Sequence, residues 1–174
     1  MEKKGQIWVE TVIYTLIALV LIGAVLAIAL PKIEEMQDNS VIEKSVAMMK
    51  DLDSKIALIG VPGNRRKVEI GLKKGELIIN GTGDKLVFRL EAEGEYSEPG
   101  EEVIDGNLII LTEKKGSKNL VTITRDYCPD AINITYNFGD TAKSFGKSAT
   151  AYNFFISREK KDAANRTVIN FEVG

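Results

Sequence analysis

Hydrophobic and polar positions divide the chain into two parts. Between Thr11 and Leu30 there are 20 consecutive residues without a charge, whereas charges are frequent from Lys32 onward. An α-helix rises about 1.5 Å per residue, so such a run covers roughly 30 Å, which is the thickness of the hydrocarbon core of a bilayer. This pattern predicts a membrane-spanning helix followed by a soluble body.

A second helical pattern follows the charge-free run. Apolar residues recur there, and the later steps are of three and four residues, which indicates an amphipathic helix. The positions are Ile33, Met36, Ile42, Val46, Met49, Leu52, Ile56 and Ile59. We expect this apolar stripe to pack on the body, on neighbouring helices, or on both.

Local signals mark the ends of this second helix. Pro31 is expected to bend the helix rather than end it. Ser40 and Glu43 match a capping box, which predicts that the helix restarts there after a loose turn at Asp38–Asn39. The glycines and proline between residues 60 and 63 are expected to end it.

After Gly63 the pattern changes to short alternating runs separated by turn residues, which is typical of antiparallel strands. The runs expected to be strands are Lys67–Leu72, Glu76–Ile79, Lys85–Glu91, Asn107–Thr112, Asn119–Arg125, Ala131–Tyr136, Tyr152–Arg158 and Thr167–Val173. The stretch Gly81–Lys85 lacks the spacing of a phosphate-binding loop and is expected to be a hairpin turn. We therefore predict an α+β fold, in which a long N-terminal helix (transmembrane, then amphipathic) is followed by an antiparallel β-sandwich-like head domain.

Composition argues against catalysis. The chain has no histidine, which excludes Ser-His-Asp and Cys-His catalysis and every histidine-ligated metal site. Its single cysteine, Cys128, is expected to be a buried small side chain, with an intermolecular disulfide as the alternative. Asp126 and Asp130 suit turn positions, and the acidic segment 91–102 suits a solvated loop. We expect no enzymatic activity, no cofactor and no metal.

Charge indicates how the chain is placed in a membrane. The net charge is −2 and the densest basic run is only Arg65–Lys67, so no nucleic-acid partner is predicted. Lys3 and Lys4 precede the span, whereas Lys32 is followed by two glutamates. The positive-inside rule therefore predicts a cytoplasmic N-terminus and an exported C-terminal domain.

Three glycosylation sequons agree with export. They begin at Asn80, Asn133 and Asn165, and all three follow the predicted span. Such triplets mark candidate sites of N-glycosylation in surface proteins. Each of these asparagines is therefore a candidate modification site.

Three fates of the N-terminal segment are open. The span is an uncleaved anchor, or a secretory signal peptide cut at Ala27-Ile28-Ala29, or a segment cut before the apolar run so that the mature chain keeps it. Glu10 bears on this choice. An ordinary signal peptide has no use for an acid there, whereas a retained helix tolerates a carboxylate in its first turns.

The N-terminal residues favour the third fate. Lys3, Lys4 and Gly5 are followed by Gln6, and Glu10 comes four residues later, at the start of the apolar helix. In these residues the chain resembles archaeal type IV pilin-like proteins, which carry a class III signal peptide. The resemblance implies that a prepilin peptidase cleaves between Gly5 and Gln6.

The same resemblance implies an architecture and a function. It divides the chain into a leader (1–5), a transmembrane and amphipathic spine (6–60) and an exported β-rich head (61–174), and it implies a structural subunit of a surface filament. The partners would be other copies, joined through their N-terminal helices, together with the peptidase, the pilus assembly machinery and the membrane. Gln6 and Glu10 would act in assembly, because the new amine of Gln6 lies about 6 Å along the helix from the Glu10 carboxylate.

Two alternatives remain. The chain is a minor pilin-like component of a secretion, DNA-uptake or archaellum-type machine, or it is an uncleaved single-pass protein whose head binds a surface ligand. The first alternative shares the processing of a filament subunit, and the second does not.

Overall fold

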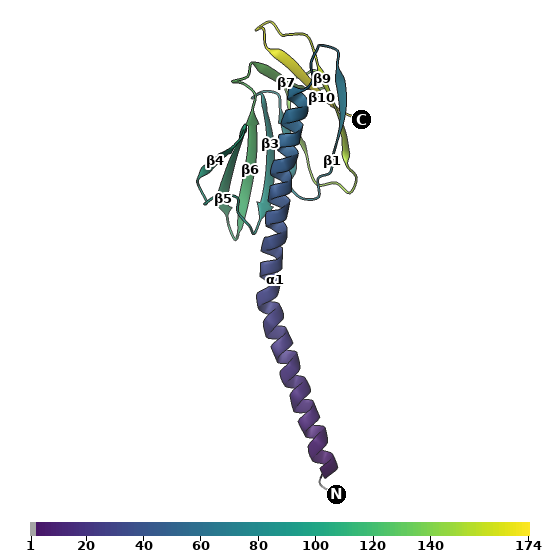
Figure 1. The fold of residues 1–174 in the computed structure, drawn as a ribbon, viewed down its shortest axis with the longest axis vertical. Coiled ribbons are helices and arrows are strands. Elements are labelled where there is room, and N and C mark those ends of the chain that lie inside the picture. The colour runs from purple at the N-terminus through teal and green to yellow at the C-terminus, as the bar shows by residue number, and fades with distance from the viewer. Residues whose placement is uncertain (1–2) are drawn as a thin grey trace. The chain divides into compact units, whose positions relative to one another are not determined.

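The computed structural model describes the backbone of residues 3–174 and the side chains from Trp8 onward. The chain begins with one helix, α1 (Lys3–Ala57), and continues as a β-rich region (Figure 1). The expected order of a long N-terminal helix followed by strands is confirmed. The helix continues through Pro31, as expected, and it ends before the glycines and proline at 60–63.

Two compact units divide after Gln37, and each is described by itself. The first unit is the N-terminal part of α1. The second unit holds the rest of α1 and every strand. The predicted division into leader, spine and head concerns processing and export, and it stays a prediction.

The predicted restart of the helix at Ser40 is wrong. Asp38 and Asn39 are helical residues inside α1, and no turn interrupts the helix there. Asp38 is only 8% exposed, and its carboxylate accepts hydrogen bonds from Lys74 Nζ at 2.5 Å and from the backbone N–H of Glu93 at 2.7 Å. A side chain that resembles a turn signal is thus satisfied by distant parts of the chain, so the helical backbone continues.

Ten strands follow the helix, and all eight predicted strands are among them. They are β1 (Arg65–Ile70), β2 (Glu76–Asn80), β3 (Lys85–Ala92), β4 (Glu102–Asp105), β5 (Leu108–Lys115), β6 (Lys118–Asp126), β7 (Ile132–Tyr136), β8 (Ala142–Phe145), β9 (Tyr152–Arg158) and β10 (Thr167–Val173). The prediction missed β4 and β8, which have four residues each and lie at the edges of one sheet. Few of their side chains are buried, so the alternation that marks a strand is weak.

The strands form two sheets. One has four strands in the order β1-β9-β10-β7, and the other has six in the order β4-β5-β6-β3-β2-β8. Most pairs are antiparallel, as expected, but β10 pairs with β7 in parallel. The chain leaves the first sheet after β7 to form β8 in the second sheet, and it returns as the β9–β10 hairpin. A strand that follows a segment in the other sheet can pair in parallel or antiparallel with its neighbour. The alternation of apolar and polar residues within the strand does not indicate which pairing forms.

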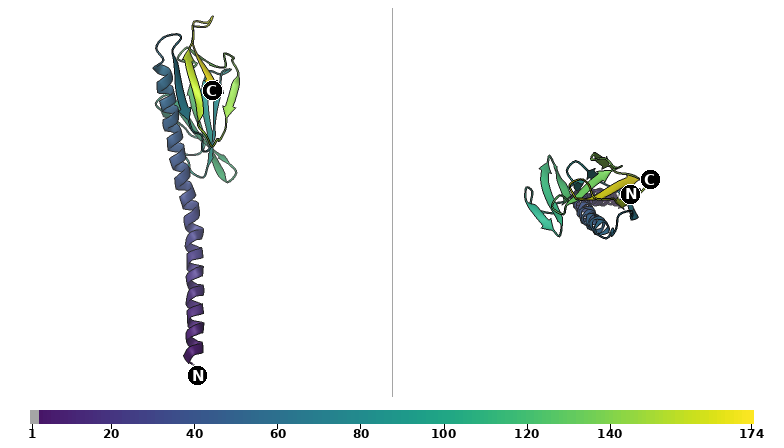
Figure 2. Two further views of the ribbon diagram at one scale, coloured as in Figure 1. Left: turned by 90° about the vertical axis from the view of Figure 1, so that its right-hand side faces the viewer. Right: turned by 90° about the horizontal axis from the view of Figure 1, so that it is seen from above.

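In the second unit, one hydrophobic core holds together the helix and the two sheets. Five residues of the predicted stripe on α1, from Ile42 to Ile56, are at most 5% exposed and belong to the same core cluster as residues of both sheets. In the left view of Figure 2, the part of α1 beyond Asp38 lies along one side of the strands. The stripe therefore packs on the body, as predicted. Its first two members, Ile33 and Met36, are exposed.

Candidate assembly segment

The N-terminal part of α1 presents apolar side chains around its whole circumference. Every large hydrophobic side chain from Trp8 to Met36 is exposed, with values between 48% at Val12 and 78% at Ile28. Within the described residues, this is the one helix long and apolar enough to cross a membrane. An exposed apolar surface of this extent is typical of a segment that interacts with a membrane or with another protein.

Glu10 stands at the beginning of this surface. It is exposed and lies in α1, and its carboxylate accepts a hydrogen bond from the Tyr14 hydroxyl at 3.2 Å. Tyr14 follows Glu10 by one helical turn, so the two side chains lie on the same face of the helix. The pair leaves a second carboxylate oxygen for other partners.

Tyr14 is not among the residues predicted to act in assembly. The signal that could have identified it is its distance of four residues from Glu10, at which a phenol can reach a carboxylate on a helix. A similar local contact follows in the next residues, where the Thr15 hydroxyl donates to the backbone carbonyl of Thr11 at 2.8 Å. At the far end of the apolar run, Lys32 Nζ lies 2.7 Å from Glu35.

The predicted processing residues fall at the limit of the described part of the chain. Gly5 and Gln6 lie within α1, but the Gln6 side chain is outside the described residues. Cleavage between them, and a role of Gln6 in assembly, stay predictions. The leader residues Met1 and Glu2 lie outside the described residues altogether.

The three sequon asparagines occupy different environments. Asn80 is the last residue of β2 and is half-buried. Asn133 lies in β7 and is 7% exposed. Asn165 precedes β10 and is exposed.

Asp126 and Asp130, which were expected to suit turn positions, lie at the end of β6 and in the turn that follows it. Asp126 accepts a hydrogen bond from the backbone N–H of Cys128 at 3.0 Å, which is a turn contact, as predicted. Asp130, in the turn, pairs with Arg125 of β6. The expectation that Cys128 is buried is wrong, because this turn leaves the thiol side chain exposed.

Arg125 connects this turn to the helix. Its Nε donates to Asp53 of α1 at 2.7 Å, and the two side chains are 12% and 16% exposed. The guanidinium also lies over the ring of Tyr127, 4.4 Å from the centroid. Burial raises the pKa of the Tyr127 phenol, and the nearby Asp53 carboxylate raises it further. These contacts between residues far apart in the sequence fasten the helix to β6.

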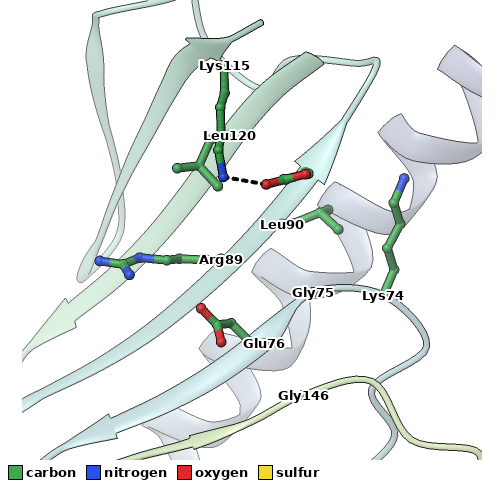
Figure 3. Close-up of a pocket in the computed structure, with 9 residues that line it drawn as sticks. Lys74, Gly75, Glu76, Arg89, Leu90, Lys115, Leu120 and Gly146 are labelled. Carbon is green, nitrogen blue, oxygen red and sulfur yellow. Dashed lines mark hydrogen bonds and ion pairs between the residues drawn. The ribbon is translucent and has the colours of Figure 1, made fainter. Parts of the chain in front are cut away.

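A hollow on the six-stranded sheet is a second candidate site (Figure 3). The charged side chains around it are largely paired, because Lys115 lies 2.6 Å from Glu91, and Lys74 is held by Asp38. Glu76 and Arg89 stand opposite each other on β2 and β3. Charges of both signs therefore line the hollow, and two of its lysines are already paired with carboxylates.

The sequence and the structure were compared with known proteins. Neither a protein-family model, nor a curated protein, nor a solved structure matches this chain. A functional assignment therefore depends on the residues of this chain alone.

Proposed function

We propose that this chain is a structural subunit of an archaeal type IV pilus-like surface filament. A prepilin peptidase removes residues 1–5, and the mature chain assembles through its N-terminal helix. Before assembly the helix crosses the membrane, with the N-terminus in the cytoplasm and the body outside. The body is then a sandwich-like head on the filament surface.

The observation that carries the proposal is the position of Glu10. Its carboxylate lies four residues after Gln6, on an exposed helix, and the next 20 residues carry no charge. A carboxylate in such a setting is expensive unless a partner or a proton neutralises it. Cleavage after Gly5 would create an amine on Gln6, which is a cationic partner at the correct distance.

The exposed apolar helix supports self-association. In lipid, helices associate through close packing and polar contacts rather than through the hydrophobic effect. A filament core built from many copies of residues 8–36 would cover the apolar side chains with one another. Glu10 would then set the axial register of neighbouring helices, as a buried polar residue does in a coiled coil.

The mature N-terminus gives the first test. Mass spectrometry of the protein from its native cells should find a chain that begins at Gln6. A chain that begins at Met1 would favour the uncleaved surface-binding protein, and one that begins at Leu30 would favour a secreted soluble form. Replacement of Gly5 with a bulky residue, as in Gly5→Val, should leave the precursor uncut, and normal processing of that variant would refute the peptidase step.

Assembly is tested separately. Glu10→Ala should be processed normally but should yield few filaments, as counted by electron microscopy of sheared cells with peptide identification. Glu10→Gln is the matched control for size, because it keeps the shape and removes the charge. Normal filaments from both variants would refute the role of Glu10. If the wild-type chain is found only at trace levels among other subunits, the minor-component alternative is favoured.

A further inference from the structure

The three sequons are equal in sequence but not in the folded chain. N-glycosylation joins a sugar to the side-chain nitrogen of asparagine, and the sequon threonine must also be accessible to the transferase. A modified asparagine must then fit the native fold with a large polar group on its nitrogen.

The sequon at Asn133 is fully engaged in the fold. Asn133 is 7% exposed, and its side-chain nitrogen donates to Asp162 at 3.3 Å. The hydroxyl of Thr135 donates to Asn170 at 3.0 Å, and Asn170 is completely buried. A glycan on Asn133 would displace Asp162 and open the edge of the four-stranded sheet, so the native fold does not accommodate it.

The sequon at Asn80 is held in a tight turn. The Asn80 side-chain oxygen accepts from the N–H of Gly83 at 3.1 Å, which folds the side chain over the turn. Thr82 donates its hydroxyl to the carbonyl of Asp140 at 3.0 Å, and the N–H of Gly81 donates to the carbonyl of Thr141 at 3.1 Å. The β7–β8 loop thus occupies the sequon hydroxyl that a transferase needs.

At the Asn165 sequon the backbone N–H groups bond to Asp162 and Ala131, but the two side-chain groups that the reaction needs are not hydrogen-bonded within the described residues. Asn165 is exposed at the turn between β9 and β10, and its φ is 62°. Its side-chain oxygen accepts from Lys161 at 3.1 Å, a contact that a glycosylated amide can keep. Among the described residues, no hydrogen bond occupies its side-chain nitrogen or the Thr167 hydroxyl. The neighbours Ala163 and Ala164 are small and exposed, which leaves space for a sugar.

We propose that Asn165 is the single N-glycosylation site of this chain. The donor would be an oligosaccharide linked to a polyprenyl phosphate. The nitrogen of Asn165 forms a bond to C1 of the first sugar and loses one proton to a base of the transferase. The bond from C1 to the phosphate oxygen breaks, and the polyprenyl phosphate leaves with its electron pair. The proposal rests on export of the body, which belongs to the proposed function.

The site has a consequence for filament architecture. A glycan on Asn165 requires that the β9–β10 turn faces solvent after assembly as well as before it. Neighbouring subunits must therefore pack on other faces of the body.

Glycopeptide mapping of the wild-type protein from its native cells tests the proposal without any variant. We expect a glycan on the peptide that contains Asn165 and unmodified peptides at Asn80 and Asn133. Asn165→Gln and Thr167→Ala should both lose the added mass, whereas Thr167→Ser keeps the sequon and should keep the glycan. A glycan at Asn80 or Asn133, or no glycan on the exported chain, would overturn the proposal.

The same sample separates this inference from the proposed function. A chain that begins at Gln6 without a glycan contradicts the inference and leaves the filament proposal intact. A chain glycosylated at Asn165 that begins at Met1 supports the inference and contradicts the processing step.

Discussion

Arg166 donates a hydrogen bond to the carboxylate of Asp84 at 2.6 Å and thereby joins the two sheets. Asp84 lies in the turn between β2 and β3, is 7% exposed and has a φ of 50°. Its other carboxylate oxygen accepts from the N–H of Ile134 in β7 at 2.9 Å. One buried side chain in a turn of the six-stranded sheet thus holds a strand of the four-stranded sheet and the residue before β10.

Asp84→Ala should destabilise the body by about 2 kcal/mol, because it leaves the Ile134 N–H and the Arg166 guanidinium without this partner. Asp84→Asn is the matched control, since it keeps an acceptor for Ile134 and tolerates a positive φ. Urea unfolding of the full chain in detergent, followed by circular dichroism, measures both variants. We expect Asp84→Asn to lower the free energy of unfolding less than Asp84→Ala does. Equal stability of the wild type and both variants would contradict the role of Asp84.

Asp38 makes the stability of the body depend on pH. Burial disfavours its charged form, but hydrogen bonds from Lys74 and from the N–H of Glu93 outweigh burial and lower the pKa below its ordinary value of 3.8. A lowered pKa in the folded state stabilises the fold above the unfolded pKa, and this contribution is lost as the pH falls through the folded pKa. Asp38→Asn should therefore cost about 1–3 kcal/mol at neutral pH.

The difference between the two chains is the measurement that isolates Asp38. In thermal unfolding, the melting temperature of Asp38→Asn should lie below that of the wild type at neutral pH. This difference should narrow below pH about 4. A difference that is constant with pH would mean that the charge of Asp38 contributes nothing.

Gly94 has no room for a side chain. A Cβ at this position would lie 1.8 Å from Oδ1 of Asn39, a buried oxygen with no hydrogen-bond donor among the described residues. Gly94→Ala should therefore destabilise the body by about 1–3 kcal/mol, the cost of overpacking. Gly71→Ala is the control, because nothing lies within 4 Å of its Cβ position.

A second substitution tests the cause. Asn39→Ala removes the obstructing side chain, so Gly94→Ala should cost much less in that background. Additive effects of the two substitutions in urea unfolding would show that the contact does not determine the cost.

Tyr14 is expected to support the role of Glu10 in assembly. Tyr14→Phe keeps the ring and removes the hydroxyl that donates to Glu10. A hydrogen bond of this kind contributes about 0.5–1.5 kcal/mol, or roughly a 2- to 10-fold change in an assembly equilibrium. Filament yield should fall while cleavage after Gly5 continues.

The double variant distinguishes this role from a general effect of the substitution. In a Glu10→Ala background, Tyr14→Phe should have no additional effect on filament yield. An equal loss of filament yield in the wild-type and Glu10→Ala backgrounds would show that Tyr14 acts through a contact other than the one with Glu10.

Local sequence patterns predicted the helix and strands in which buried and exposed residues alternate regularly. The stripe from Ile42 to Ile56 and the eight longer strands were predicted from spacing, because each buries one face repeatedly along its own length. The charge-free run was predicted from its length and its lack of charge. The short strands β4 and β8 were missed because four residues give too few alternations. The candidate site was recognised through Gly5, Gln6 and Glu10, but Tyr14 was not included.

The tertiary structure alone decided what depends on partners distant in the sequence. Asp38 has the same side chain as a turn residue, yet Glu93 and Lys74 satisfy it within a continuous helix. The parallel pairing of β7 with β10 is a further case. Sequons with the same pattern differ because Asp162 and Asn170 bond the side chains of Asn133 and Thr135, and Asp140 bonds the Thr82 hydroxyl. Within the described residues, no such bond reaches the Asn165 side-chain nitrogen or the Thr167 hydroxyl. Periodicity indicates which face of a helix or strand is apolar. The hydrogen-bond partner of each polar atom depends instead on how distant parts of the chain pack together.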